Sequence, residues 1–163
     1  MKPNALILFA PGTNRDGDVA LALQLAGAQT SIMPLKTLRE ENINWNDYQM
    51  LVLPGGFSYA DALGAGKLLA LDLSQYFLEQ VNGFVSAGKP VIGICNGFQA
   101  LVKSGILPGR ETLQHAQFST LTYNQGNHFE CRWVTLNPVS QTCLWTKGLE
   151  RLIDCPVAHG EGN

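Results

Sequence analysis

The residue best suited to do chemistry in this sequence is Cys95, which lies in the spacing Gly93-x-Cys95-x-Gly97. This is the spacing of a nucleophile elbow, in which a reactive side chain stands on a tight turn between a strand and a helix. Glycines are needed beside it because neighbouring Cβ atoms would collide in such a turn. The N–H groups at the start of the helix favour a negatively charged sulfur. A free cysteine is more often a small buried hydrophobic residue, but this setting predicts a nucleophile.

The pair Gly55-Gly56 is a second chemical signal, because it comes directly after an apolar run that ends at Pro54. Two glycines after a buried strand let backbone N–H groups approach a ligand closely. Pro-Gly-Gly alone is more often an ordinary tight turn. Beside a cysteine elbow, the backbone N–H groups of Gly56 and Asn96 become candidates for the two halves of an oxyanion hole. The elbow alone leaves several families of cysteine enzyme open.

Apolar runs and turn residues predict the elements that position these groups. We expect strands at 4–9, 29–33, 49–53 and 90–94, and helices at 18–26, 63–85 (broken near 72–74) and 96–105. Strands that alternate with helices form a parallel sheet with helices on both faces. Ligands bind beyond the carboxyl ends of such strands. We therefore expect residues 10–12, Gly55-Gly56 and Cys95 to converge on one crevice.

The sequence changes character after Gly109. Residues 117–123 and 128–136 alternate between apolar and polar, with a turn signal at 124–127 between them. This pattern predicts an antiparallel hairpin. The whole chain therefore reads as a single α/β domain over residues 1–163, with a mostly parallel sheet followed by a C-terminal antiparallel hairpin.

The composition excludes several classes of function. The chain has 163 residues, of which 45% are hydrophobic and 15% charged, as in ordinary globular domains. A formal net charge of −2, without clusters of lysine and arginine, argues against a nucleic-acid partner. No apolar run approaches the ~18 residues that a membrane span needs. The four cysteines form no C-x-x-C pair, so we expect no zinc site and a reduced, cytoplasmic protein.

Four motifs, in order along nearly the whole chain, resemble those of the class I glutamine amidotransferases. They are Gly55-Gly-Phe-Ser-Tyr-Ala-Asp61, Cys95-Asn-Gly-Phe-Gln99, Phe129-Glu-Cys-Arg-Trp-Val134 and Pro156-Val-Ala-His-Gly-Glu-Gly162. Within that family they are most similar to the glutaminase components of phosphoribosylformylglycinamidine synthase, in which asparagine typically follows the nucleophile, as Asn96 does here. Ala60 departs from the glycine that the family carries. The resemblance implies a flavodoxin-like sheet.

The resemblance also implies a role in de novo purine synthesis. Glutamine is hydrolysed, and the ammonia passes to a synthetase component that converts formylglycinamide ribonucleotide to formylglycinamidine ribonucleotide. By this resemblance Cys95 forms a glutamyl thioester, while the N–H groups of Gly56 and Asn96 hold the oxyanion. Three positions match those around the bound glutamine: Gly55, Phe57 and Gln99. No metal or cofactor is expected in this chain, because ATP and magnesium belong to the synthetase partner.

Amide hydrolysis also needs a proton donor and a base, a role that usually falls to a histidine held by an acid. The chain has three histidines, of which His115 and His128 are expected at the surface. His159, two residues before Glu161, has a spacing that would suit a triad. In the family, however, these two residues match an upstream signature, and the catalytic pair lies in a later Pro-His-Pro-Glu segment. Since that segment does not occur here, we expect a truncated domain with little glutaminase turnover by itself.

Two other readings stay open. One is a different cysteine hydrolase on a similar flavodoxin-like sheet, such as the DJ-1/PfpI group. Those proteins usually carry an acidic residue near the nucleophile on an early strand, where this sequence has Ala-Pro-Gly-Thr-Asn at 10–14. The other is a catalytically incomplete scaffold or regulatory subunit, which would bind the synthetase without turning over glutamine.

Overall fold

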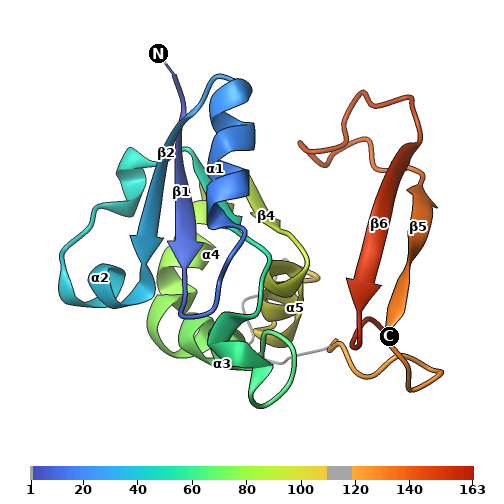
Figure 1. Cartoon of the computed structure of the whole chain (residues 1–163). Helices are drawn as coiled ribbons and strands as arrows, with labels where there is room; N and C mark the ends of the chain where they lie inside the picture. The colour runs from blue at the N-terminus through green and yellow to red at the C-terminus, as the bar shows by residue number, and fades with distance from the viewer. Residues whose placement is uncertain (1, 110–118) are drawn as a thin grey trace. The chain divides into compact units, whose positions relative to one another are not determined.

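The computed structural model describes residues 2–109 and 119–163. The chain divides into two compact units, Met1–Leu121 and Thr122–Asn163. The first carries the α/β layers that the sequence predicts, and the second carries a two-stranded ribbon (Figure 1).

The first unit is built on a parallel four-stranded sheet in the order β2-β1-β3-β4 (Figure 1). The strands are β1 Asn4–Phe9, β2 Gln29–Pro34, β3 Met50–Leu53 and β4 Val91–Gly93. Each lies within one residue of its predicted bounds. This order is the beginning of the flavodoxin-like order, so the predicted sheet is confirmed.

Helices connect the strands of this sheet. The α-helices are α1 Asp16–Leu25, α2 Leu35–Glu40, α3 Lys67–Asp72, α4 Leu78–Ser86 and α5 Asn96–Lys103. The short helical segments are η1 Trp45–Asp47, η2 Ser58–Asp61 and η3 Leu73–Phe77. The expected break near 72–74 corresponds to η3, a π-helical segment between α3 and α4, and Phe77 at its end has a φ of −129° and a ψ of 6°. None of the described helices is long and apolar enough to cross a membrane.

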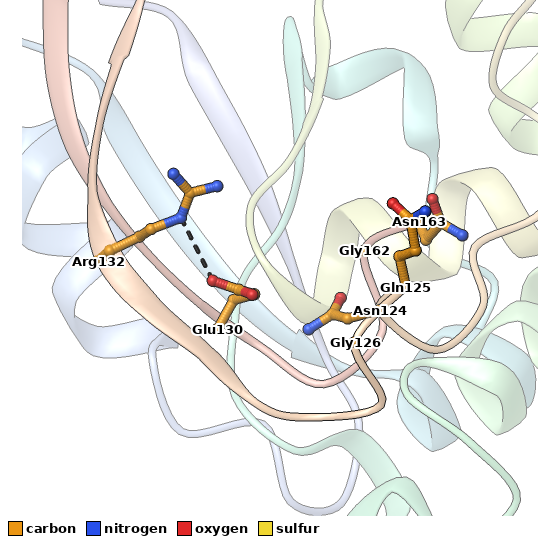
Figure 2. Close-up of a pocket in the computed structure, with 7 residues that line it drawn as sticks. All are labelled: Asn124, Gln125, Gly126, Glu130, Arg132, Gly162 and Asn163. Atoms are coloured by element: carbon orange, nitrogen blue, oxygen red, sulfur yellow. Dashed lines mark ion pairs between the residues drawn. The ribbon is translucent and has the colours of Figure 1, made fainter.

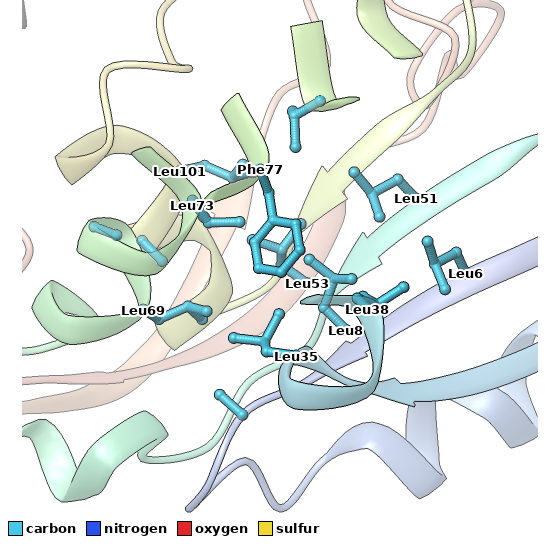
Figure 3. Packing of buried hydrophobic residues seen from close by; sticks show 14 of the residues in the cluster. Leu6, Leu8, Leu35, Leu38, Leu51, Leu53, Leu69, Leu73, Phe77 and Leu101 are labelled. Atoms are coloured by element: carbon cyan, nitrogen blue, oxygen red, sulfur yellow. The ribbon is translucent and has the colours of Figure 1, made fainter. Parts of the chain in front are cut away.

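Successive strand residues point to opposite faces of the sheet, and they build two apolar clusters. The larger cluster joins sheet leucines to apolar side chains from α2, α3, η3, α4 and α5 (Figure 3). Its sheet leucines are Leu6, Leu8, Leu51 and Leu53. On the other face, Ile7 and Val52 pack against Ala20 of α1. The prediction of helices on both faces is therefore confirmed.

The second unit is an antiparallel pair of strands, β5 Glu130–Leu136 and β6 Ile153–His159 (Figure 1). A C-terminal hairpin is thus present, as predicted. The strand expected at 128–136 is β5, but its partner is β6 and not the segment 117–123. Residues 117 and 118 lie outside the described residues, and Tyr123 forms only an isolated bridge, with Glu161.

The turn signal at 124–127 does not close the hairpin because the side chain of Asn124 forms hydrogen bonds elsewhere. Its side chain is buried, and its Nδ2 donates hydrogen bonds to the carbonyl oxygens of His128, at 2.9 Å, and His159, at 2.8 Å. Asn124 thus links the segment before β5 to the end of β6. The pairing of β5 is set by the ladder with β6 and by the long-range contact of Asn124 with His159, and not by the nearest alternating segment.

Candidate active site

Cys95 stands in a strained turn between β4 and α5. Its φ is 51° and its ψ is −113°, a backbone conformation that residues other than glycine rarely adopt. The Ile94 N–H donates to the Leu53 carbonyl at 3.0 Å, and the Gly97 N–H donates to the Ile94 carbonyl at 2.9 Å. Cys95 itself is exposed, so its thiol is accessible to a ligand. The predicted elbow is present, while the role of Cys95 as nucleophile stays a prediction.

Close packing explains both glycines of the elbow. A Cβ built on Gly97 would lie 2.1 Å from the carbonyl oxygen of Leu53. A Cβ on Gly93 would lie 2.8 Å from the carbonyl carbon of Gly97. Backbone atoms cannot make room for a side chain at such distances, so α5 packs directly against the main chain of β3 and β4. The position of Cys95 is therefore fixed by contacts between backbones.

Gly55 brings the second predicted signal to the elbow. A Cβ built on this residue would lie 3.2 Å from the Cβ of Cys95. The sheet register explains the approach, because Leu53 pairs with Gly93, and Gly55 and Cys95 each come two residues later in the sequence. The next residue, Gly56, has a φ of +134°, which glycine adopts without strain.

The loop after β1 joins the same place. Thr13 and Gly56 form an isolated bridge, and the Phe57 N–H donates to the Gly12 carbonyl at 3.1 Å. A Cβ on Gly56 would lie 2.6 Å from the backbone nitrogen of Asn14. The ends of β1, β3 and β4 therefore converge, as the sequence predicts.

The other predicted site residues occupy two environments. Phe57 is 61% exposed, whereas Gln99 is buried and accepts a 3.3 Å hydrogen bond from Asn96 Nδ2 through its Oε1. Asn96 lies in the first turn of α5, where backbone N–H groups have no acceptor inside the helix. Contact of Gly55, Phe57 and Gln99 with glutamine stays a prediction, as does oxyanion binding by Gly56 and Asn96.

Sequence reasoning missed a buried hydrogen-bond network around the Asn96 side chain. Its Oδ1 accepts from the Ser58 N–H at 3.1 Å and from the Ser58 hydroxyl at 2.5 Å. Its Nδ2 donates to Asp61 Oδ1 at 2.8 Å, and the same carboxylate oxygen accepts from the Gly66 N–H at 3.0 Å. Ser58 and Asp61 both lie in the motif at 55–61, which was the available signal.

The loop that carries Ser58 and Asp61 is held in an unusual conformation. Three consecutive residues, Tyr59, Ala60 and Asp61, have φ values of 54°, 54° and 51°. The Tyr59 hydroxyl donates to the carboxylate of Asp72. Burial, followed by this hydrogen bond, raises the pKa of Tyr59 well above its usual range. The neutral phenol therefore anchors the loop to α3. Ala60 has a conformation that suits glycine, the residue expected there in the family.

The histidines of the second unit have partners of their own. Nδ1 of His159 lies 2.9 Å from Oδ1 of Asn124, so an amide holds this ring. Nε2 of the exposed His128 lies 2.9 Å from a carboxylate oxygen of Glu130. His115 lies outside the described residues. A catalytic role for His159 and Glu161 stays untested.

Two pockets have linings that do not include the elbow residues. One, of about 450 Å³, is polar and lies in the second unit (Figure 2). There Arg132 Nε lies 3.3 Å from Oε2 of Glu130. The other, of about 400 Å³, lies beside α3 and η3, with Tyr59 and Asp72 in its lining. Neither lining includes Cys95. Among residues 2–109 and 119–163, no group of three or more His, Cys, Asp or Glu side chains is placed to hold a metal ion.

Comparison with known proteins identifies a family. The family model of the CobB/CobQ-like glutamine amidotransferase domain matches residues 2–163. A curated relative from Treponema denticola, named phosphoribosylformylglycinamidine synthase subunit PurQ, is 59% identical, over 99% of this chain and 63% of its own length. The protein of the same name from Dehalococcoides mccartyi is 47% identical, over 99% of this chain and 62% of its own. The chain thus spans less than two thirds of these relatives.

Solved structures agree with this family. The chain is similar to one in a structure described as PurLQS from Thermotoga maritima, with a TM-score of 0.71 and 32% identity, over 99% of this chain and 68% of that one. A glutamine amidotransferase from the same organism gives a TM-score of 0.62 at 15% identity, over 99% of this chain and 62% of that one. The second likeness shows the fold alone.

Proposed function

The chain belongs to the CobB/CobQ-like glutamine amidotransferase domain family, and we propose that it is the glutaminase component of a phosphoribosylformylglycinamidine synthase. In this role it releases ammonia from glutamine for a synthetase that makes formylglycinamidine ribonucleotide. The names of the relatives support the proposal, and so does the likeness to a chain of PurLQS.

The observation that carries the proposal is the approach of Gly55 to Cys95. The two residues follow different strands, β3 and β4, and a Cβ built on the glycine would lie 3.2 Å from the cysteine Cβ, closer than ordinary van der Waals contact. A thiol at an elbow thus lies directly beside a glycine turn. This combination suits acyl transfer, because a nucleophile and donors to a developing oxyanion are needed together.

The chemistry follows in two steps. The Cys95 thiolate attacks the side-chain amide carbon of glutamine, and the N–H groups of Gly56 and Asn96 donate to the oxygen that becomes negative. The C–N bond then breaks, ammonia leaves with an added proton, and a glutamyl thioester remains on the sulfur. Water hydrolyses the thioester to glutamate and restores the thiol. Dividing the reaction in this way replaces one difficult step by two easier ones.

The proton donor and the base are a separate requirement. We assign neither role to His159, because its Nδ1 faces the amide of Asn124. The resemblance places a histidine and a glutamate in a Pro-His-Pro-Glu segment, which these 163 residues do not contain.

The synthetase is the proposed partner, and it is also where ATP and magnesium are expected to bind. The cytoplasm is the proposed location, since all four cysteines are free, as in reducing compartments. The DJ-1/PfpI reading loses support because the family model of the CobB/CobQ-like glutamine amidotransferase domain matches residues 2–163. The experiment must therefore distinguish a glutaminase component from a non-enzymatic scaffold.

The test uses a complete enzyme, in which a glutaminase component that contains these residues together with a Pro-His-Pro-Glu segment is assembled with its synthetase. With glutamine as nitrogen donor, Cys95→Ala is expected to abolish formation of formylglycinamidine ribonucleotide. With free ammonia, the same variant is expected to retain it, because the synthetase is unchanged. Binding of the synthetase with no glutamine-dependent synthesis by the unmodified complete enzyme would instead favour a scaffold.

A further inference from the structure

We propose that Asn96 is a positioning residue whose side-chain amide joins the Gly55-Gly56 turn to the Cys95 elbow. The inference rests on the proposed function and adds a part to it. Two backbone N–H groups on different loops can stabilise one oxyanion only if the loops keep a fixed separation. The amide of Asn96 provides that fixed separation, since it is buried between them and is 2% exposed.

The carbonyl end of this amide holds the glycine turn. Ser58 comes two residues after Gly56 in the sequence, and both its N–H and its hydroxyl donate to Asn96 Oδ1, at 3.1 Å and 2.5 Å. The N–H and the hydroxyl of Ser58 thus donate to the same oxygen of Asn96. Asn96 is itself the residue after Cys95, so this oxygen joins the turn to the first residue of α5.

The amino end of the amide fixes its orientation. Nδ2 donates to Asp61 Oδ1 at 2.8 Å and lies 3.3 Å from Gln99 Oε1. The Ser58 N–H can only donate and an ionised carboxylate can only accept, so the amide must face them in this one direction. An aspartate at position 96 would place a second acceptor opposite Asp61. A leucine would leave the Ser58 N–H without a partner.

Loss of the Asn96 amide should affect the chemical step more than substrate binding. A buried donor that loses its partner is destabilising, and the loop can recover part of that loss by moving away. Movement of the turn changes the donor geometry for the transition state, where loss of one oxyanion donor costs roughly 10²–10³-fold in rate. Binding of the intact amide substrate is affected less. The predicted defect is therefore in the rate of the chemical step.

The experiment measures how fast a diazoketone analogue of glutamine alkylates Cys95 in the full chain, with the adduct located by mass spectrometry. Asn96→Asp is expected to lower the maximal labelling rate roughly 10- to 100-fold, as expected for a misplaced oxyanion donor, with little change in half-saturating concentration. Adding Asp61→Asn restores a donor opposite the new carboxylate and should recover part of the rate. Val81→Ala, a core change outside the network, controls for lost stability.

Three results would overturn the inference. The first is an unchanged maximal rate in Asn96→Asp, and the second is an equal loss in Val81→Ala. The third is the absence of any recovery when Asp61→Asn is added. If Asn96→Asp does not fold, Ser58→Ala removes only the 2.5 Å bond, and an unchanged rate in that variant also contradicts the proposal.

The same assay separates this inference from the proposed function. If glutamine does not protect the unmodified chain, and the analogue labels Cys95 no faster than iodoacetamide does, the proposed function itself is wrong. If labelling is selective and glutamine protects, but the Asn96 variants behave normally, only the positioning role is wrong.

Discussion

The two units of this chain are each stabilised by a different kind of interaction. Every buried apolar side chain among the described residues belongs to the first unit. In the second unit Trp133 is 72% and Val139 77% exposed, and the buried side chain is the polar Asn124. An isolated two-stranded ribbon is marginally stable at best. The comparison teaches that the elbow stands on a packed framework, whereas the hairpin depends on hydrogen bonds.

The cysteines show the same division. Cys95 in the first unit is exposed on a strained turn. In the second unit, a hydrogen bond from the backbone of Trp145 and then one from the side chain of Thr146 lower the pKa of the Cys143 thiol. The thiol whose pKa is lowered and the thiol beside the glycine turn are therefore different residues. Position, and not acidity alone, should decide which one reacts with a substrate-shaped molecule.

The largest expected effect separates these two cysteines. Cys95→Ala should lower labelling by the diazoketone analogue at least about 1000-fold, because a missing nucleophile cannot be replaced. Cys143→Ala should leave that rate unchanged. Site-resolved mass spectrometry checks both variants. Substantial analogue labelling at Cys143 in the unmodified chain would break the comparison.

A second prediction concerns stability. Phe77 is 2% exposed in the core of the first unit, so Phe77→Ala should lower the free energy of unfolding by about 3–5 kcal/mol. Trp133→Ala removes an exposed ring of the hairpin and should cost less than about 0.5 kcal/mol. Urea unfolding followed by circular dichroism measures both. Equal losses would show that the hairpin is packed after all.

A third prediction tests the backbone contact beneath the elbow. Gly97→Ala places a methyl group 2.1 Å from the Leu53 carbonyl oxygen, and overpacking of this kind costs about 1–3 kcal/mol or more. Gly83 in α4 has no atom within 4 Å of an added Cβ, so Gly83→Ala should stabilise the chain by about 0.5–1 kcal/mol. Thermal unfolding distinguishes the two. A harmless Gly97→Ala would contradict the close packing of α5 on β3.

A fourth prediction concerns the left-handed loop. Ala60 has a φ of 54° and a ψ of 22°, which costs a non-glycine residue about 1–2 kcal/mol. Ala60→Gly should therefore stabilise the chain by about 0.5–1 kcal/mol, after allowing for the more flexible unfolded state. Destabilisation, measured by the same urea titration, would mean that the alanine methyl group makes a contact worth more than this strain.

The smallest expected effect is the pH dependence of alkylation by iodoacetamide. A lowered pKa keeps Cys143 partly ionised at a lower pH than an ordinary cysteine, and the thiolate is the reacting form. As the pH falls through the ordinary thiol range, at about pH 8.5, labelling of Cys143 should begin to decline at a lower pH than labelling of the exposed Cys131. Site-resolved mass spectrometry across a pH series measures both rates. Parallel decline would show that the hydrogen bonds to Cys143 are absent in solution.

Local patterns were enough to predict the framework and the elbow. The strands of the sheet are short apolar runs bounded by turn residues. The Gly93-x-Cys95-x-Gly97 spacing is typical of a tight turn between a strand and a helix. The partner of β5 was not predictable in this way, because strand pairing depends on contacts between distant segments. Alternation alone favoured 117–123, while β6 provides seven paired positions.

The network around Asn96 escaped prediction for a related reason. Its partner Ser58 lies 38 positions away in the sequence. Neither an asparagine nor a serine by itself predicts a hydrogen bond between two such distant residues. The left-handed loop also gave no signal, since Tyr59, Ala60 and Asp61 include no glycine. Only the glycine expected at position 60 in the resembling family pointed to that conformation.

The contact of Gly97 with the Leu53 carbonyl has a consequence for how such a protein evolves. Because backbone atoms are in direct contact at Gly97, side chains outside this contact and outside the Asn96 network are free to vary without displacing the sulfur. A lineage built on this fold can therefore change which molecule the crevice accepts by altering peripheral residues. Relocating the nucleophile itself would require a new strand and a new helix.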